Sequence, residues 1–326
     1  MSFQKCKVKG MGVNSEAYHN QEAKRGTAEF ILSPSSIKAF AECPSRWKAG
    51  YESPDSDAKD YGNLLDVLVL TPESFQERFS VKPSTYPAEP AKKGGEVVQK
   101  PFNANSTWCR EWIESQGDKT VISQNDLADA VAAKNRLMAD ETIAAFHAAS
   151  DKQVHVAGQW KDDKTGLVIP VQCLIDFVPW KESEFQKSLG DLKTTRNAGQ
   201  RVFGRWCYTA GYHIQAAFDI DLYTAATGED RTDWIFILQE NYSPFETGRR
   251  LLSADLLQIG RQTYQHALSR YARCLKTGDW AGYDPADEFS LIQAEPWMEF
   301  NALSEAMESD QAEALEAATQ TDDLIP

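Results

Sequence analysis

Two carboxylates and a lysine on neighbouring strand-like segments constrain this chain more than any other feature of its sequence. Asp176 lies within the apolar run of residues 171–178, and Asp191 and Lys193 end another strand-like stretch. Alternate residues of a β-strand share a face, so Asp191 and Lys193 point the same way while Leu192 points into the core. A hairpin joining the two segments would bring both carboxylates and the ammonium together. These groups are the minimum needed to hold a divalent cation and an activated water.

Each part of this pattern also has an ordinary alternative. A single Asp in a strand can be a turn or edge carboxylate, and a Lys two residues from an Asp can form a simple salt bridge. The combination favours a site, because a carboxylate beside apolar strand residues is costly to bury unless it is paired or bound to a metal. Spacing alone leaves the salt bridge open.

Length and composition indicate one large globular domain with appendages. The chain has 326 residues, of which 42% are hydrophobic and 11% aromatic. It contains no apolar run long enough to span a membrane and does not begin with the apolar segment of a secretory signal, so we expect a cytoplasmic protein without membrane contact. The six cysteines are scattered without a CxxC pair, which argues against a zinc or disulfide framework.

The negative charge of the chain is concentrated at its C-terminal end. The net charge is −14, and residues 301–326 contain seven acidic residues and no Lys or Arg. We expect residues 291–326 to form an acidic, disordered tail. The rest of the chain is therefore less acidic than the total suggests, and a local basic groove is not excluded.

The remaining pattern predicts an α/β fold. Residues 1–28 are expected to form a flexible arm and residues 83–107 a long loop. The helices are expected to start at Ser33-Pro34 and to cover 60–70, 107–116, 124–149, 200–226 and a segment from Ser253 to about Gly278. Strands are expected at 154–160, 167–178, 185–193, 234–238 and, at an edge, 246–251. Together these elements predict a small mixed β-sheet flanked by helices, with extra helices on the N-terminal side.

Several segments of the chain resemble the PD-(D/E)xK nuclease superfamily, and more narrowly the RecE-type (exonuclease VIII-like) exonucleases of phages and prophages. Two of them are specific in this order: Asp191-Leu-Lys193-Thr-Thr195 is similar to the DVKTT motif, and Tyr212-His-Ile-Gln215-Ala-Ala-Phe218 to YHVQDAF. Weaker matches support them and include Tyr18-His19, Phe30 to Ile37, Tyr61 to Phe75, and Trp160 to Gly166, which is similar to a W-x-D-x-x-T-G hairpin. The resemblance covers roughly residues 14–285 and implies a restriction-endonuclease-like core over 29–290.

The resemblance also implies the roles of the site residues. Asp176 and Asp191, with the backbone carbonyl of Leu192, would bind Mg²⁺ or Mn²⁺, as two ions. Lys193 would orient or deprotonate the attacking water and stabilise the charge that develops on the phosphate. Gln215 would support Lys193 or contact the DNA strand.

The chain departs from the family pattern at three positions. Asp66 stands where the family has a His ligand, and we expect it to be a third metal ligand rather than a surface carboxylate. Asp219 replaces a family Tyr, and Tyr223 lies one turn further on. The family's Glu ahead of the first core strand aligns near His155, which we interpret as a half-buried strand residue.

Related nucleases bind an iron–sulfur cluster through a Cys-Pro motif like Cys43-Pro44 together with three cysteines near the C-terminus. In this chain only Cys274 lies in that region. We therefore expect no cluster, and we interpret Cys43 as a packed residue at a helix end.

Contacts with DNA should come from basic residues near the site. Arg196, Arg201 and Arg205 follow the catalytic Lys, and Lys92 and Lys93 lie in the long loop. Each of these could also be an ordinary surface charge. Trp206 and Tyr208 are interpreted as core residues, with a wedge that splits the end base pair as the less favoured reading.

The implied activity is Mg²⁺-dependent hydrolysis of linear double-stranded DNA from its ends, in the 5′→3′ direction. The product would be a 3′ single-stranded tail for a RecT-like annealing protein, and the enzyme would be a ring-like homo-oligomer. Two alternatives remain open. One is a non-catalytic DNA-binding or assembly protein on a degenerate nuclease fold, and the other is a structure-specific endonuclease of the same superfamily.

Overall fold

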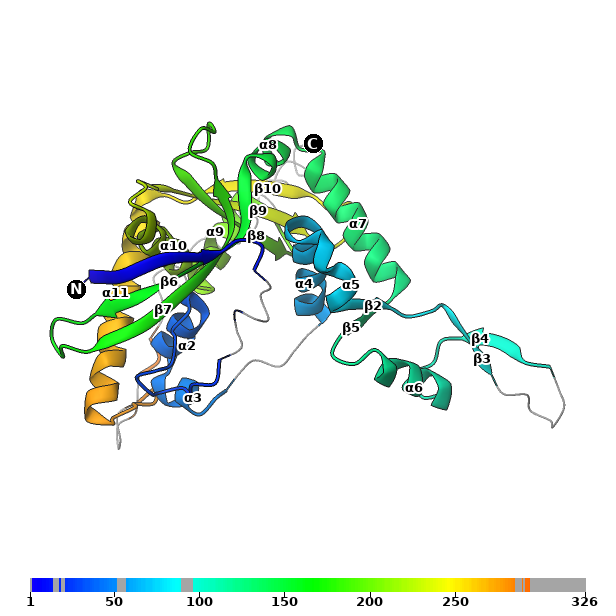
Figure 1. Ribbon diagram of the computed structural model, residues 1–326, viewed down its shortest axis with the longest axis horizontal. Coiled ribbons are helices and arrows are strands. Elements are labelled where there is room, and N and C mark those ends of the chain that lie inside the picture. The colour runs from blue at the N-terminus through cyan, green and yellow to red at the C-terminus, as the bar shows by residue number, and fades with distance from the viewer. Residues whose placement is uncertain are drawn as a thin grey trace, which may run out of the picture. The chain divides into compact units, whose positions relative to one another are not determined.

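A six-stranded sheet forms the centre of the fold (Figure 1). The computed structural model describes residues 2–13, 18, 21–51, 57–88, 96–284, 289 and 291–293. The strands of this sheet are, in their order across it, β1 (Ser2–Gly10), β6 (Ser150–Lys161), β7 (Val168–Pro179), β8 (Ser188–Thr195), β9 (Asp233–Glu240) and β10 (Thr247–Leu251). Neighbouring strands are antiparallel except β8 and β9, which are parallel. The predicted mixed sheet is therefore confirmed.

Helices flank this sheet, as predicted. They are α2 (Pro34–Glu42), α3 (Pro44–Lys48), α4 (Asp57–Leu70), the short η1 (Pro72–Ser74) and α5 (Phe75–Arg78), α6 (Thr107–Ser115), α7 (Gln124–Met138), α8 (Glu141–Ala148), α9 (Gln200–Thr209), α10 (Tyr212–Thr227) and α11 (Ala254–Thr277). Two small sheets accompany them, β2 (Phe79–Val81) with β5 (Thr120–Ile122) and β3 (Thr85–Ala88) with β4 (Val98–Pro101). Among the described residues, none of the helices combines the length and the apolar character needed to span a bilayer.

The predicted helix ends are well defined by their caps. The side chain of Ser33 accepts a hydrogen bond from the Ser36 amide at the start of α2, as expected of an N-cap serine. Ser253 caps α11 in the same way, and Gly278 ends that helix in the left-handed conformation with φ of 75°. Cys43 is buried at the junction of α2 and α3, which confirms its interpretation as a packed helix-end residue.

Two segments that were expected to be irregular contain strands. Residues Ser2–Gly10 pair with β6 at the edge of the main sheet, so this part of the expected arm is ordered. The reason is that Phe3, Cys6 and Val8 pack against the core, which the polar composition of the segment hides. Within the expected loop 83–107, β3 and β4 form an antiparallel pair next to α6, and Tyr86 stacks on Trp108.

Two predicted long helices are each divided in two. The segment 124–149 breaks after Met138, because the side chain of Asp140 accepts hydrogen bonds from the Thr142 and Ile143 amides and starts α8. The segment 200–226 breaks at Gly211, whose φ of 68° is left-handed. Only glycine adopts that conformation readily, so α9 and α10 are separate helices.

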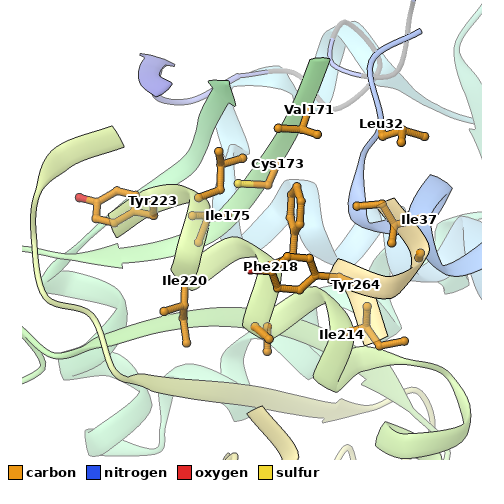
Figure 2. Close-up of a cluster of buried hydrophobic side chains, with 14 of the residues drawn as sticks. Leu32, Ile37, Val171, Cys173, Ile175, Ile214, Phe218, Ile220, Tyr223 and Tyr264 are labelled. Atoms are coloured by element: carbon orange, nitrogen blue, oxygen red, sulfur yellow. The ribbon is translucent and has the colours of Figure 1, made fainter. Parts of the chain in front are cut away.

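The main core lies between the sheet and helices α10 and α11. Figure 2 shows side chains of α2, β7, α10 and α11 meeting there, among them Ile37, Ile175 and Phe218. The rings of Phe218 and Tyr264 meet edge to face, with centroids 5.4 Å apart. Helix α10 is buried on nearly all sides because it packs against both the sheet and α11. This burial fixes the helix that carries Gln215.

The sheet opens between β7 and β8, and this opening positions the candidate site. The two strands pair only at Phe177 and Gly190. Further along β7, Leu32 takes the neighbouring place: its amide donates to the Pro170 carbonyl and its carbonyl accepts from the Gln172 amide. The segment that precedes α2 thus occupies the gap beside β7.

Candidate active site

Asp176 and Asp191 face each other across the last paired position of β7 and β8. Phe177 pairs with Gly190, so the next residue on each strand, Asp176 and Asp191, are opposite one another and share a face. The Leu192 amide donates a hydrogen bond of 2.8 Å to Oδ2 of Asp176. The hairpin therefore brings the two carboxylates together as the sequence predicts.

The second carboxylate, Asp191, is buried and held by two side chains. Its Oδ2 lies 2.6 Å from the Nζ of Lys193, and its Oδ1 accepts a hydrogen bond of 3.0 Å from Nε2 of Gln215. Leu192, between Asp191 and Lys193, packs into the core on the opposite face. Gln215 thus contacts the Asp191 carboxylate, whereas the sequence led us to expect support of Lys193 or a contact with DNA.

Gln153 is a site residue that the sequence analysis missed. It stands on β6 between the pairs Lys152–Phe177 and Val154–Ile175, and is therefore opposite Asp176. Its Nε2 donates a hydrogen bond of 2.7 Å to Oδ1 of Asp176. It is also a non-glycine residue with positive φ, 48°, and such strain is typical of functional sites.

A signal for Gln153 was present in the sequence. The family's Glu aligns near His155, which is two residues away on the same face of the strand. His155 itself is half-buried and bonds to Gln172, which confirms its interpretation as a strand residue.

Asp66 approaches the same site from α4. It lines a small cavity of about 30 Å³ together with Gln153 of the site and with Val13, Asn63, Thr71 and Arg78. Its carboxylate interacts electrostatically with both Asp191 and Lys193. A larger cavity, of about 450 Å³, lies between α2 and α11 and contains none of the predicted site residues.

The pKa values of these groups reflect burial and crowding of like charges. Burial raises the pKa of Asp66 to about 7, and the nearby Asp191 carboxylate adds to the shift. Burial, and then the charges of Asp191 and Asp66, hold the pKa of Asp176 well above its usual value. Burial alone would lower the pKa of Lys193, but the Asp191 and Asp176 carboxylates raise it above its usual range. Lys193 is therefore a cation at neutral pH.

The donor set is chemically suited to a divalent cation of the Mg²⁺ type. Asp66, Asp176 and Asp191 offer hard oxygen ligands, and their crowding concentrates negative charge that such an ion would neutralise. In the described ranges, no three or more His, Cys, Asp or Glu side chains already converge as a metal cage. Both oxygens of Asp176 accept hydrogen bonds from the protein, so an ion would share or displace these bonds.

A second lysine that the sequence analysis did not single out lies beside the site. The Nζ of Lys38, on α2, is 5.2 Å from the centroid of the Tyr212 ring, and the Nζ of Lys193 is 5.2 Å from the same centroid. Burial, and then repulsion from Lys193, lowers the pKa of Lys38 to about 8. The arrangement places two ammonium groups around one aromatic ring next to the carboxylates.

The predicted DNA-contacting residues fall into two groups. Arg196, Arg201 and Arg205 are exposed on the turn after β8 and on α9. Lys92 and Lys93 lie outside the described residues. Trp206 and Tyr208 are 55% and 56% exposed, so their interpretation as core residues is wrong. The buried face of α9 is formed by Phe203 and Cys207 instead.

The remaining departure from the family pattern is Asp219 on α10, whose carboxylate interacts electrostatically with Asp191 and Lys193. Asp219 is completely buried near Cys173, and burial holds its pKa well above the usual value. Tyr223 bonds through its hydroxyl to Glu229, and the Arg231 guanidinium lies over its ring. Tyr223 therefore does not take the place of the missing family Tyr.

Comparisons with known proteins agree with this architecture. A crystal structure from Eubacterium rectale, described as a "Putative exonuclease", superposes with a TM-score of 0.51 at 17% sequence identity, covering 90% of this chain and 99% of that chain. Because the two sequences are only 17% identical, this comparison shows a similar fold and not a shared activity. No curated protein matches the sequence.

The match to a sequence family is more extensive. Residues 33–291 match the family described as "PDDEXK-like domain of unknown function (DUF3799)". That range contains every residue of the candidate site, including Asp66 on α4 and Gln215 on α10. The chain belongs to this family of PDDEXK-like domains and has the nuclease-type fold of the PD-(D/E)xK superfamily.

Proposed function

We propose that this chain is a divalent-metal-dependent exodeoxyribonuclease of the RecE type, which hydrolyses phosphodiesters at the ends of linear double-stranded DNA. The observation that carries the proposal is the pairing of Asp176 with Asp191, with Lys193 held on Asp191 at 2.6 Å. Membership of the PDDEXK-like family supports it, and so does the likeness of fold to a protein described as an exonuclease.

Each side chain of the site has a distinct part in this reaction. Mg²⁺ or Mn²⁺, bound as two ions, would supply the Lewis acid and the activated water. Asp66, Asp176 and Asp191, with the Leu192 carbonyl, would hold the ions. Gln153 and Gln215 fix the orientation of Asp176 and Asp191 through their hydrogen bonds. The Lys193 ammonium would donate to a phosphate oxygen and offset the charge that develops there.

The proposal extends to the path of the DNA. Arg196, Arg201 and Arg205, with Lys92 and Lys93, would hold the phosphate backbone. Digestion would run 5′→3′ and leave a 3′ single-stranded tail for a RecT-like annealing protein. The active form would be a ring-like homo-oligomer, acting in the cytoplasm where its substrate lies. The polarity, the annealing partner and the ring are proposed from the resemblance to RecE-type enzymes, and the backbone contacts from the positions of the basic residues in the sequence.

A second candidate is a non-catalytic DNA-binding protein on a nuclease fold. One observation favours it: both oxygens of Asp176 are already bonded, to Gln153 and to the Leu192 amide. A site that had lost its metal could close in this way.

One digest separates these functions. Linear and covalently closed duplexes of the same sequence are incubated with the full-length protein, with Mg²⁺ and with EDTA. An exonuclease degrades only the linear DNA, and only with Mg²⁺. Cleavage of the closed circle would identify an endonuclease. Binding without cleavage of either substrate, unchanged in Lys193→Ala, would identify the non-catalytic protein and contradict the proposal.

A further inference from the structure

The outward face of α9 combines arginines with large exposed apolar side chains. Arg201, Arg205 and Tyr208 recur at helical spacing along one ridge, and Val202 and Trp206 form the ridge beside it. Val202 is 51% exposed, Trp206 55% and Tyr208 56%. Exposed side chains of this size, gathered on one helix turn after turn, indicate a surface that binds another molecule.

The inward face of α9 connects this surface to the candidate active site. Phe203 is buried and stacks on Tyr212, with ring centroids 6.2 Å apart and planes at 29°. The Nζ of Lys193 lies 5.2 Å from the centroid of the same Tyr212 ring. Helix α9 also packs against α10, the helix that carries Gln215 (Figure 1). The helix that carries the exposed ridges is therefore linked to Lys193 through the stacked rings of Phe203 and Tyr212.

The sequence around this helix is basic, although the chain as a whole is acidic. The segment from Leu192 to Phe218 has 27 residues with four Lys or Arg and no Asp or Glu, in a protein with 48 acidic residues and a net charge of −14. The basic residues are Lys193, Arg196, Arg201 and Arg205. A polyanion would be attracted to this segment although the chain as a whole is acidic.

The side chains on the ridge have few partners within the protein. Over the described ranges, the guanidinium groups of Arg201 and Arg205 form no ion pair or side-chain hydrogen bond, and Trp206 forms no ring contact. Tyr208 stacks on His213, with centroids 5.0 Å apart and planes at 14°, which fixes the orientation of its ring. The arginines and the indole are thus available to a ligand.

We propose that the outward face of α9 is a binding surface for single-stranded DNA. The arginine ridge would hold successive phosphates, and the face of Trp206 would stack on a base, because every base has an aromatic face and stacking tolerates any sequence. This inference rests on the proposed function, because the ligand is taken to be DNA for that reason. What it adds is the surface that holds a single strand as the strand enters or leaves the active site. The competing occupant is a second copy of this chain, because subunit interfaces are also formed by exposed apolar and aromatic side chains.

Binding of a labelled single-stranded oligonucleotide, measured by fluorescence anisotropy in EDTA, tests this surface in the full-length protein. Trp206→Ala should weaken binding by about tenfold or more, and Trp206→Phe by much less, because a ring remains to stack. The control is Trp180→Ala, since Trp180 is 50% exposed but lies beyond the opposite end of the β7–β8 pair. It should bind like the wild type.

The salt dependence separates the two ridges. Arg201→Ala and Arg205→Ala should each reduce the slope of log K against log salt by roughly 0.7, whereas Trp206→Ala should leave the slope unchanged. Equal binding by Trp206→Ala and the wild type would overturn the proposal. So would a Trp206→Ala protein that sediments as a smaller species, since the face would then be a subunit interface.

A failure of the proposed exonuclease function can be distinguished from a failure of this inference. A wild-type protein that binds the oligonucleotide through Trp206 but does not cleave DNA with Mg²⁺ would contradict the exonuclease and leave the α9 surface intact.

Discussion

At the scale of single residues, the site is a row of side chains across three strands. Gln153, Asp176 and Asp191 stand opposite one another on β6, β7 and β8, and Gln215 reaches the row from α10. The amides donate to the carboxylates and Lys193 balances part of their charge. Such a row holds acidic groups close together in fixed orientations, which is what binding a hard divalent cation requires.

The first prediction concerns the charge of Asp66. Its pKa of about 7 in the folded protein exceeds the usual 3.8, so between these values the folded protein keeps a proton that the unfolded chain has lost. The stability of the metal-free protein should therefore fall as pH rises from about 4 to about 7. Asp66→Asn should reduce this fall, and Mg²⁺ should stabilise the wild type at pH 7.5 more than the variant.

Thermal unfolding across that pH range, with and without Mg²⁺, measures both effects. Asp129→Asn, at an exposed position on α7, serves as the control and should follow the wild type. If the stability of Asp66→Asn depended on pH in the same way as that of the wild type, the pKa of Asp66 would not be raised by the site.

The second prediction concerns Gln153. Gln153→Leu keeps the volume but removes the donor to Asp176, and it should reduce metal affinity or kcat by about 10–100-fold. The measurement is cleavage rate against Mg²⁺ concentration. Gln159→Leu, on the same strand, is the matched control and should change neither quantity. Equal rates for Gln153→Leu and the wild type at every concentration would show that the hydrogen bond has no part in the reaction.

At the scale of elements, close contacts between α10 and α11 hold the site's supporting helix. A Cβ atom at Gly260 would lie 2.2 Å from the His213 carbonyl oxygen, a contact with backbone that cannot move without shifting α10. Gln215 is two residues further along α10, so this packing sets its position against Asp191.

Gly260→Ala should therefore destabilise the protein by about 1–3 kcal/mol, as overpacking in a core does. Gly204→Ala provides the control, because a Cβ atom there meets open space on the exposed side of α9. It should be neutral or slightly stabilising, since Ala has the higher helix propensity. Chemical denaturation of both variants decides, and equal stabilities would mean that α10 and α11 are less closely packed than the structure indicates.

Many of the helices and strands could be predicted from the sequence. The strand pattern around Asp176 and Asp191 and the caps at Ser33 and Ser253 are local signals, and they produced the right elements. The breaks at Asp140 and Gly211 were missed because the apolar pattern continues through them and only one residue changes the backbone direction. The strand Ser2–Gly10 was missed because its stability comes from contacts with β6 and the core, far away in sequence.

The site was predicted to a similar extent. Its carboxylates and lysine are close in sequence, so strand periodicity and one hairpin were enough to place them together. Gln153 and Lys38 could not be found that way, because they reach the site only through the register of β6 and through the segment that enters the gap beside β7. A glutamine in a strand and a lysine in a helix are both common, so nothing in the neighbouring sequence marks Gln153 or Lys38 as a site residue.

At the scale of the whole molecule, charge is segregated along the chain. Residues 301–326 contain seven of the acidic residues and no Lys or Arg, whereas Leu192 to Phe218 contain no acidic residue at all. On the proposed function, the negative charge of residues 301–326 would compete electrostatically with DNA for the basic segment.

Removing residues 301–326 should therefore strengthen DNA binding at low salt, with the difference disappearing at high salt because exposed charges are screened. The melting temperature should not change, since residues 1–280 form a compact unit by themselves. Anisotropy titrations at several salt concentrations test this, and a truncated protein with unchanged affinity at low salt would show that the tail's charge does not act on DNA.

The central claim, that Asp176, Asp191 and Lys193 form a nuclease site, is tested most directly by a single-turnover digest of end-labelled linear duplex DNA with Mg²⁺. The wild type is compared with Asp191→Ala and with Asp230→Ala, whose aspartate is exposed and paired with Lys187. We predict that the wild type and Asp230→Ala release the labelled 5′ nucleotides at the same rate and that Asp191→Ala releases none. Release by Asp191→Ala at the wild-type rate would contradict the account.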